Sequence, residues 1–211
     1  AARKAMLPGQ VLLTPAALMS TLPHQIRLIG GQWKRTRLGV PGMPGLRPTP
    51  DRVRETLFNW LGQDLAGWRA LDAFAGTGAL GLEAASRGAQ SVLLVEQDAR
   101  LAAALRQHQQ RLSASAVRVL RGDGVAALHG QPAGSLDVVF LDPPFAAAGL
   151  YAPALAAAAK ALRPGGFVYL EADASWQGRP EAASFTLRRH LKAGAVHAHL
   201  FCKPLPTEEK P

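Results

Sequence analysis

The chain has 211 residues, 48% of them hydrophobic, and a formal net charge of +9. This length and composition predict a globular protein of one domain with appendages, or at most two small domains, and exclude a disordered chain or a coiled coil. No uninterrupted apolar run reaches the roughly 18 residues of a membrane span. The single cysteine, Cys202, cannot form an internal disulfide, and no Cys/His spacing resembles a zinc site. We therefore expect a soluble, cytoplasmic protein without a metal site.

Most of the positive charge lies near the N-terminus. Residues 1–54 contain nine Lys or Arg and a single acid, Asp51, whereas the remaining 157 residues contain fifteen basic and fourteen acidic side chains. A basic segment on a nearly neutral body favours a polyanionic partner, most simply nucleic acid. A solubilising tail or a surface for acidic lipid is the alternative interpretation.

The chain before residue 51 predicts an arm and a small hairpin. Residues 1–24 contain three prolines and no sustained hydrophobic period, which indicates a flexible arm. Residues 25–50 predict a basic β-hairpin, with its turn at Gly30 and Gly31, followed by a proline-rich linker. The candidate RNA contacts come from this segment and from the start of the next, and they are Arg27, Trp33, Lys34, Arg35, Arg37, Arg52 and Arg54.

Three of these candidates have a second interpretation. Trp33 either stacks on a base or covers the apolar face of the hairpin. Arg52 and Arg54 either contact phosphate or the carboxylate of a ligand, or they are solvated arginines at the start of a helix.

Residues 51–211 predict the main domain. Its first helix covers residues 51–61, with Thr49 or Asp51 as the cap. Apolar strand-like runs then alternate with Ala/Leu-rich helical patterns. The runs are residues 70–74, 92–95, 117–120, 138–141 and 167–170, and the helical patterns between them are residues 80–87, 99–112, 123–128 and 150–162. This alternation predicts a doubly wound α/β domain, in which a mostly parallel sheet is covered by helices on both faces.

Two further strands, at residues 184–191 and 196–201, end the domain. The connection between them is too short for a crossover, so they should pair antiparallel as a hairpin at one edge of the sheet. His190, His197 and His199 have no acidic partners at metal-binding spacing and are expected in or beside this hairpin.

A glycine-rich turn follows the first strand of the series. Gly76, Gly78 and Gly81 form a G-x-G-x-x-G pattern, and Glu96 stands twenty residues after Gly76, where an acid can bind ribose hydroxyls. These features fit both NAD and S-adenosylmethionine. Asp72 favours S-adenosylmethionine, because a carboxylate about 4 Å from a pyrophosphate costs on the order of 4 kcal/mol at an effective dielectric constant of about 20, whereas a sulfonium or ammonium is attracted. A tight turn that binds no ligand is the structural alternative.

The candidate cofactor residues lie mostly at the carboxyl ends of the first three strands. Asp123 is a candidate acceptor for an adenine amino group, although an Asp before an apolar helical pattern is also an ordinary N-cap. The full set of candidates for binding S-adenosylmethionine is Thr49, Asp72, Phe74, Gly76, Gly78, Glu96, Asp123 and Gly124.

The sequence Asp142-Pro143-Pro144-Phe145 after the fourth strand is the most specific signal in the chain. Its prolines restrict the backbone, so that the Asp142 carboxylate and the Pro143 carbonyl form a rigid pair of acceptors. A planar amino group can donate one hydrogen to each while its ring stacks on Phe145. Asp142, Pro143 and Phe145 are therefore the candidate catalytic residues. A plain strand end, with Asp142 as a cap, is the alternative.

The acid at position 142 also bears on the acceptor base. One carboxylate can accept hydrogen bonds from the adjacent N1–H and N2–H₂ donors of guanine, whereas adenine offers a donor beside an acceptor, which suits an amide. Guanine N2 is the better match for Asp142.

Four segments together resemble one known family. They are residues 25–34 (QIRLIGGQWK), 46–61 (LRPTPDRVRETLFNWL), 71–83 (LDAFAGTGALGLE) and 142–145 (DPPF). They are similar to the bacterial 16S ribosomal RNA guanine-N2 methyltransferases, the RsmD family. The resemblance implies a Rossmann-like class I methyltransferase fold, S-adenosylmethionine as methyl donor and one guanine of 16S rRNA as acceptor. It also implies that the substrate is the assembled or nearly assembled small ribosomal subunit, with the basic hairpin holding RNA.

Other functions stay open at this point. They are a methyltransferase acting on adenine N6 or another amino group of nucleic acid, a non-catalytic RNA-binding module and an NAD-binding protein. Whichever applies, we expect a monomer without a metal or membrane partner.

Overall fold

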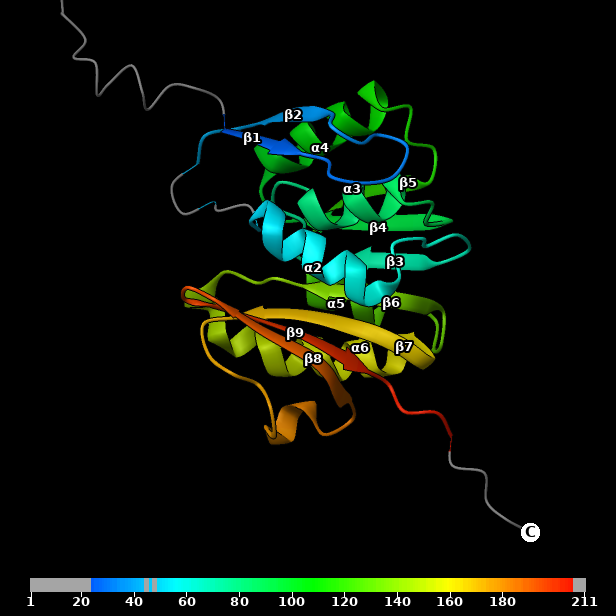
Figure 1. The fold of residues 1–211 in the computed structure, drawn as a ribbon, viewed down its shortest axis with the longest axis vertical. Coiled ribbons are helices and arrows are strands. Elements are labelled where there is room, and N and C mark those ends of the chain that lie inside the picture. The colour runs from blue at the N-terminus through cyan, green and yellow to red at the C-terminus, as the bar shows by residue number, and fades with distance from the viewer. Residues whose placement is uncertain (1–23, 44–45, 47–48, 207–211) are drawn as a thin grey trace, which may run out of the picture.

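The centre of the fold is a seven-stranded sheet in the order β5-β4-β3-β6-β7-β9-β8 (Figure 1). Its strands are β3 (Arg69–Asp72), β4 (Ser91–Glu96), β5 (Val117–Arg121), β6 (Leu136–Leu141), β7 (Leu162–Ala172), β8 (Thr186–Ala193) and β9 (Val196–Cys202). Strands β3 to β7 pair in parallel, and β9 runs antiparallel to both β7 and β8. The computed structural model describes residues 24–43, 46 and 49–206, so the expected arm lies outside the described residues except for His24.

Helices cover both faces of this sheet. One face carries α2 (Asp51–Leu61), α3 (Ala79–Ser86) and α4 (Ala99–Arg111), and the other carries α5 (Gly124–His129) and α6 (Tyr151–Ala161). Two short 3₁₀ segments, η1 (Phe145–Leu150) and η2 (Pro180–Ala182), lie in connections. The predicted α/β class, the mostly parallel sheet and the antiparallel hairpin at its edge are confirmed. None of the helices in the described part of the chain is long and apolar enough to cross a membrane.

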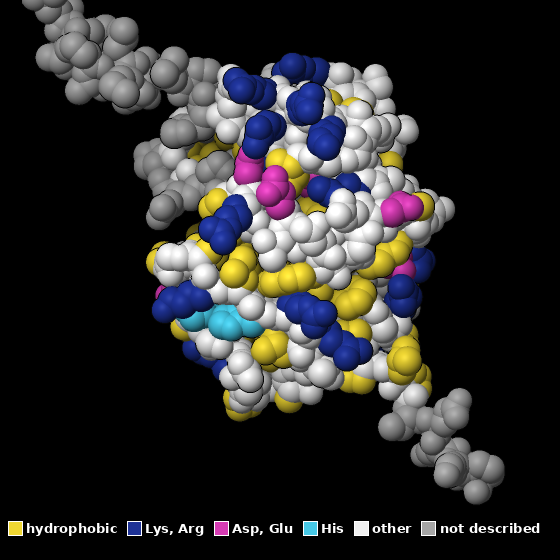
Figure 2. Space-filling view, viewed as in Figure 1, with side chains coloured by type: hydrophobic (Ala, Val, Ile, Leu, Met, Phe, Trp, Pro, Cys, Tyr) yellow, Lys and Arg dark blue, Asp and Glu magenta, His cyan; other side chains and the backbone are white. Residues whose placement is uncertain are grey.

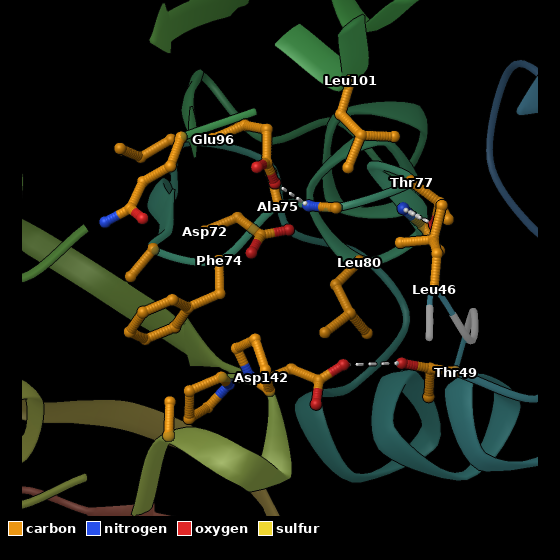
Figure 3. A pocket seen from close by; sticks show the side chains of 18 of the residues that line it. Leu46, Thr49, Asp72, Phe74, Ala75, Thr77, Leu80, Glu96, Leu101 and Asp142 are labelled. Atoms are coloured by element: carbon orange, nitrogen blue, oxygen red, sulfur yellow. Dashed lines mark hydrogen bonds between the residues drawn. The ribbon is translucent and has the colours of Figure 1, made fainter. Parts of the chain in front are cut away.

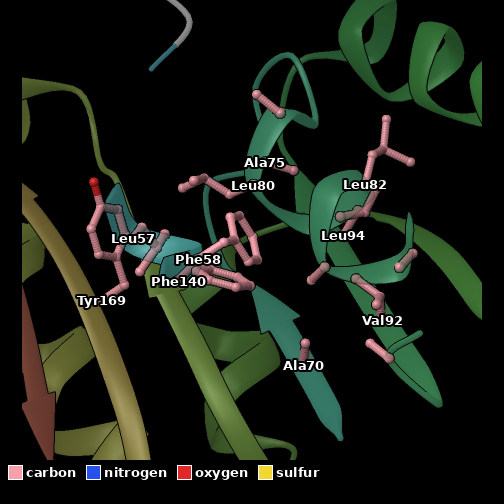
Figure 4. Close-up of a cluster of buried hydrophobic side chains, with 14 of the residues drawn as sticks. Leu57, Phe58, Ala70, Ala75, Leu80, Leu82, Val92, Leu94, Phe140 and Tyr169 are labelled. Carbon is pink, nitrogen blue, oxygen red and sulfur yellow. The ribbon is translucent and has the colours of Figure 1, made fainter. Parts of the chain in front are cut away.

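The apolar residues of the strands and helices form one hydrophobic cluster on each face of the sheet. On the α2 side, Phe58 of α2 packs against Phe140 of β6 with ring centroids 6.2 Å apart, and Phe140 in turn meets the edge of Tyr169 on β7 (Figure 4). On the α6 side, alanines of α6 let the helix approach the sheet closely, and Leu155 is fully buried there. The strands are therefore buried from both sides, as their continuous apolar runs predicted.

The strand order reverses direction between β3 and β6. The chain goes from β3 outward to β4 and β5, then returns to place β6 on the other side of β3, with Asp72 level with Phe140. The connections after β3 and β6 therefore leave the sheet side by side and in opposite directions. This is the position at which an open parallel sheet has a ligand crevice.

A separate two-stranded sheet, formed by β1 (His24–Arg27) and β2 (Arg37–Val40), packs near α3 and α4 (Figure 1). The predicted hairpin is thus present, but the prediction of its turn at Gly30 and Gly31 was wrong, since all of residues 28–36 connect the strands. The glycines serve close packing instead. A Cβ on Gly31, which has φ +69°, would lie 1.8 Å from the carbonyl oxygen of Ser86, and the Ser86 hydroxyl donates to the carbonyl of Gly30.

Candidate active site

A cavity of about 380 Å³ opens at the carboxyl ends of β3, β4 and β6 (Figure 3). Its volume is within the usual range for small-molecule sites. The described residues that line it are Leu46, Thr49, Asp72, Ala73, Phe74, Ala75, Gly76, Thr77, Ala79, Leu80, Val95, Glu96, Gln97, Leu101, Asp142, Pro143, Pro144, Ala147 and Leu150. The cavity joins the glycine-rich turn after β3 to the Asp-Pro-Pro segment after β6, so the two most informative motifs of the sequence share one site.

The glycine-rich turn holds a tight, left-handed path. Gly76 and Gly78 have φ values of +49° and +79°, a region that favours glycine. The Gly76 N–H donates to Glu96 Oε2 over 2.8 Å, and Glu96 Oε1 accepts from the Asp98 N–H over 2.8 Å. The Glu96 carboxylate therefore ties the turn after β3 to the end of β4 while it lines the cavity.

Asp72 is the most deeply buried acid in the wall of the cavity, with 1% of its surface exposed. Its Oδ2 accepts from the Gly81 N–H over 3.1 Å, whereas its Oδ1 has no hydrogen-bond partner among the described residues. Burial, with smaller contributions from the nearby charges of Glu96 and Glu171, raises the pKa of Asp72 to about 7. Such a carboxyl group is poised to accept a donor or a cation from the cavity.

Asp142 stands across the cavity from Asp72, in the segment after β6 (Figure 3). The Thr49 hydroxyl donates to Asp142 Oδ2 at 3.5 Å. Burial raises the pKa of Asp142 well above its usual range, and the charges of Glu171 and Asp72 act in the same direction. Glu171 itself is 3% exposed and accepts from the Tyr169 hydroxyl over 2.7 Å.

The charge in this cavity has the opposite sign to the charge of the protein. Carboxylates of Asp72, Glu96 and Asp142 line it and Glu171 lies behind its wall, whereas its described lining residues include no Lys, Arg or His. In a chain of net charge +9, this concentration of acids disfavours pyrophosphate and favours a cation. The unpartnered Asp72 Oδ1 and the apolar wall formed by residues such as Leu80 and Leu101 fit the positively charged, partly apolar S-adenosylmethionine.

Most of the predicted cofactor and catalytic residues come together here. Thr49, Asp72, Phe74, Gly76, Glu96, Asp142 and Pro143 all line the cavity. Gly78 does not line it; a Cβ at this position would lie 2.5 Å from a methyl group of Leu105, so its role is in packing. The side chain of Phe145, at the start of η1, lies outside the described residues.

Asp123 and Gly124 are not among the residues that line the cavity. The Asp123 side chain caps α5 by accepting from the Ala126 N–H over 2.7 Å, and its other oxygen accepts from the Gln97 amide over 3.0 Å. A Cβ on Gly124 would lie 2.0 Å from the carbonyl oxygen of Ala73. The N-cap interpretation of Asp123 is confirmed, and a contact of either residue with a cofactor stays a prediction.

Some of the predicted RNA contacts are exposed, and others contact residues of the protein itself. Lys34, Arg35, Arg37 and Arg52 are exposed, and Figure 2 shows Lys and Arg gathered over the end of the molecule that carries β1 and β2. Arg27 is about half exposed and pairs with Asp51 over 2.7 Å. Trp33 is half-buried and packs against the main hydrophobic cluster, so part of its surface covers apolar neighbours as the second interpretation held.

The prediction that Arg54 contacts RNA was wrong. Its side chain is 1% exposed and lies 3.6 Å from the fully buried Glu83, while its Nη2 donates to Asp51 and to the carbonyl oxygen of Arg27. Glu83 also accepts from Arg87 Nε over 2.9 Å. The sequence around Arg54 is typical of an exposed helix start, and it gives no indication of burial because the partner, Glu83, is far away in the sequence. The N-cap of α2 is Pro50, without a side-chain cap, so Thr49 and Asp51 do not cap this helix.

Comparisons with known proteins agree with this fold. A family model described as conserved hypothetical protein 95 matches residues 26–202. Ribosomal RNA small subunit methyltransferase D of Escherichia coli K12 is 49% identical over 121 residues, which are 57% of this chain and 61% of that protein. The protein of the same name from Haemophilus influenzae is 44% identical over 126 residues, 57% of this chain and 64% of its own length. The chain thus spans about three fifths of the length of these curated relatives.

Solved structures cover more of the chain. The protein yhhF from Escherichia coli, provisionally designated a methyltransferase, is 38% identical with a TM-score of 0.76, and the match covers 87% of this chain and 100% of that chain. A protein of Haemophilus influenzae, provisionally designated a methylase, is 33% identical with a TM-score of 0.71, over 86% of this chain and 99% of that chain. The fold is that of Rossmann-like class I methyltransferases. Because the family model matches nearly the whole described chain, the protein belongs to the conserved hypothetical protein 95 family, which is the RsmD family that its motifs resemble.

Proposed function

We propose that this protein transfers the methyl group of S-adenosylmethionine to the exocyclic N2 of one guanine in 16S rRNA, a site of the guanine-966 type, on the assembled or nearly assembled small ribosomal subunit. The observation that carries this proposal is the acid-lined cavity, in which Asp72 and Asp142 lie on opposite walls. A cationic methyl donor fits the Asp72 side, and a flipped base reaches the Asp142 side. The relatives named as ribosomal RNA small subunit methyltransferases support methyl transfer to the RNA of the small subunit.

S-adenosylmethionine supplies an electrophilic methyl carbon on a sulfonium when it is bound. The residues of this chain would position the acceptor. The Asp142 carboxylate and the Pro143 carbonyl each accept one hydrogen of a planar amino group, which turns its nitrogen lone pair out of conjugation with the ring and toward the methyl carbon. Asp142 and Pro143 would hold the amino nitrogen toward the methyl carbon that the bound donor would supply, and the methylated nitrogen would release one proton to solvent. Catalysis by Asp142 is therefore orientation and electrostatics.

The choice of guanine rests on the carboxylate of Asp142. An ionised carboxylate accepts two parallel hydrogen bonds, as the N1–H and N2–H₂ edge of guanine requires. Burial holds the pKa of Asp142 well above its usual range, and a bound cation beside it would lower that pKa and favour the ionised form. The donor and the acceptor base thus bind cooperatively through the same charge.

The basic hairpin supports an RNA substrate. Arg27 and Arg37 are directly opposite each other on β1 and β2. Arg27 pairs with Asp51, whereas Arg37 forms no ion pair with a described residue, so the positive charge of Arg37 is available to an anion. Arg35 has φ +71°, in the left-handed region, which costs of order 1 kcal/mol or more for a residue other than glycine. Arg35 thus presents a positive side chain at a backbone position that would suit glycine better. We infer that the exposed face of the hairpin contacts phosphates of the RNA and that the protein acts as a monomer in the cytoplasm.

The test uses small subunits from a strain that lacks the methyltransferase, incubated with labelled S-adenosylmethionine and digested to nucleosides. We expect label in N2-methylguanosine. Asp142→Asn should lower the rate by roughly 10²-fold or more, the size of effect seen when one oriented hydrogen-bonding group is removed from an active site, whereas the exposed Asp173→Asn should have no effect. Label in N6-methyladenosine would show that the acceptor base is adenine and not guanine. Unchanged guanine methylation by Asp142→Asn would overturn the role assigned to the Asp142 carboxylate.

Two binding measurements separate the remaining alternatives. Purified protein should bind S-adenosylmethionine and not NAD; the reverse result would favour the NAD-binding alternative. Replacing Lys34 and Arg37 by Ala should weaken subunit binding and lower the slope of log K against log salt by roughly 0.7 to 0.9 for each lost phosphate contact. The exposed Lys160 on α6 serves as the matched control. An unchanged slope in the hairpin variant would refute the assignment of the RNA surface.

A further inference from the structure

Three histidines meet on the hairpin formed by β8 and β9, away from the cavity. His190 on β8 stands opposite His199 on β9 in the antiparallel register, and His197 lies two residues before His199, on the same face of the strand. One ring nitrogen from each histidine lies within 4.8 Å of the others. Figure 2 shows histidine side chains at the surface over this hairpin. None of the three lines the proposed methyl-transfer cavity.

The two more accessible histidines already bring ring nitrogens together. His190 Nε2 and His197 Nδ1 are 3.0 Å apart. Their rings are nearly parallel, with an angle of 17° between planes and 5.2 Å between centroids, and the two nitrogens face each other. Two imidazole nitrogens on one tetrahedral metal are roughly 3.3 Å apart, because each metal–nitrogen bond is about 2.0–2.1 Å long. The separation of the two nitrogens is thus close to that in a metal site, and rotation of both side chains would turn the two nitrogens toward one ion.

The third histidine is fixed behind this pair. His199 is fully buried, its Nε2 accepts from the Trp176 N–H over 3.0 Å, and its Nδ1 bonds the Leu170 carbonyl over 3.2 Å, which defines Nδ1 as the protonated nitrogen. Both of its nitrogens are therefore engaged with the backbone. Its ring stacks on His190 at 4.6 Å between centroids and 15° between planes. His199 thus acts as a rigid surface that orients His190.

We propose that His190 and His197 form a binding site for a divalent transition metal ion of the class that prefers imidazole, namely Ni²⁺, Cu²⁺ or Zn²⁺, with His199 as a positioning residue. Imidazole ligands suit these ions, and water would complete the coordination. Of the two facing nitrogens, the one that carries the shared hydrogen must transfer it to the other nitrogen of its ring, through solvent, before the metal binds. The described residues include no carboxylate that forms an ion pair with either histidine.

The metal would join the last two strands of the sheet. β8 is the edge strand, held on one side only by β9, and a bridge from His190 to His197 would add a second link across this pair. The expected role is stabilisation of the hairpin. It does not depend on methyl transfer, because the two sites share no lining residue.

The test uses the full chain with Cu²⁺ and Ni²⁺ as probes. Titration calorimetry should show one equivalent of metal bound, and the electron paramagnetic resonance spectrum of the Cu²⁺ complex should show coupling to two imidazole nitrogens. His190→Ala and His197→Ala should each weaken binding roughly tenfold or more and leave one coupled nitrogen. Ni²⁺ at a hundredfold excess over its wild-type dissociation constant should raise the midpoint of thermal unfolding by roughly 5–10 °C in the wild type, and by about half of that or less in the His190→Ala and His197→Ala variants.

The control is His129→Ala, which removes an exposed histidine at the end of α5 and should bind metal as the wild type does. Circular dichroism without metal shows whether each variant is folded, and both substituted positions are at or near the surface. Equal binding by the wild type and the His190→Ala and His197→Ala variants would mean adventitious binding elsewhere and would overturn the proposal. So would the absence of a stoichiometric site in the wild type.

Discussion

Replacing Asp72 by Asn should stabilise the protein at neutral and alkaline pH while it weakens binding of the methyl donor. Burial raises the pKa of Asp72 from 3.8 to about 7. In the unfolded chain the carboxyl group ionises near 3.8, so the folded state binds more protons between these pH values. The preference of the folded state for the protonated Asp72 therefore contributes fully to the free energy of unfolding below about pH 4. This contribution is lost as the pH rises to about 7.

The size of the effect follows from the pKa shift. One pKa unit corresponds to about 1.36 kcal/mol, so a shift from 3.8 to about 7 amounts to about 4 kcal/mol of folding free energy lost between acidic and alkaline pH. Asn has nearly the same shape, can still accept from the Gly81 N–H as Asp72 Oδ2 does, and does not ionise. Asp72→Asn should match the wild type near pH 4 and exceed it by up to about 4 kcal/mol at pH 8.

Urea unfolding followed by circular dichroism at pH 4, 6 and 8 measures this difference. At pH 8 the midpoint of Asp72→Asn should lie up to roughly 1–4 M above that of the wild type, given the usual slope of about 1–3 kcal/mol per molar urea. Asp173→Asn, which changes an exposed carboxylate, should follow the wild type at each pH. If Asp72→Asn and the wild type have equal midpoints at pH 8, the carboxylate is not destabilised by burial, and its assignment as the anchor for a cation loses its physical basis.

Three further outcomes are expected from the same structure. Binding of S-adenosylmethionine near pH 7 should release a fraction of a proton, because a cation lowers the raised pKa of Asp72; calorimetry in buffers of different ionisation enthalpy measures the release, and equal heats in all buffers would contradict it. Arg54→Met should lower the free energy of unfolding by about 3–5 kcal/mol, because it removes one partner of the fully buried Glu83; thermal unfolding checks this, and a change below about 1 kcal/mol would show that Glu83 is satisfied without it. Gly81→Ala should also destabilise the fold, since its Cβ would lie 2.1 Å from a methyl group of Leu94; wild-type stability in urea would mean that the neighbours move aside.

Local patterns in the sequence determined the elements of this fold and much of its site. Hydrophobic runs and helical spacing predicted each strand and α-helix from residue 51 onward, because periodicity reflects which side chains each element buries. The predicted ends agree with the structure to within two residues except at β7, which begins at Leu162 and not at residue 167, and the two 3₁₀ segments were not predicted. The two motifs that line the cavity were also readable, since the carboxyl ends of neighbouring parallel strands meet at one edge of the sheet. The sequence alone therefore predicts that Asp72 and Asp142 share one site, and both line the cavity.

Contacts between residues distant in the sequence decided the rest. The sequence of α2 alone predicts a solvated Arg54. Only the packing of α2 against α3 brings Arg54 to Glu83 and buries it. Gly30 and Gly31 read as a turn, yet their lack of side chains serves the approach of the hairpin to Ser86. Such roles depend on a partner that local propensity does not specify.

The histidines on β8 and β9 show both contributions together. The alternation of His197 and His199 along one strand was visible, and so was the short turn that pairs this strand with the one carrying His190. The register of the pairing decided that His190 stands opposite His199 and that one ring nitrogen of His190 reaches His197. A shift of one residue would have turned these side chains to opposite faces, because strand side chains alternate with a period of two. The residue types and their spacing specify which groups are available on each strand, and the long-range pairing of the strands specifies which of them meet.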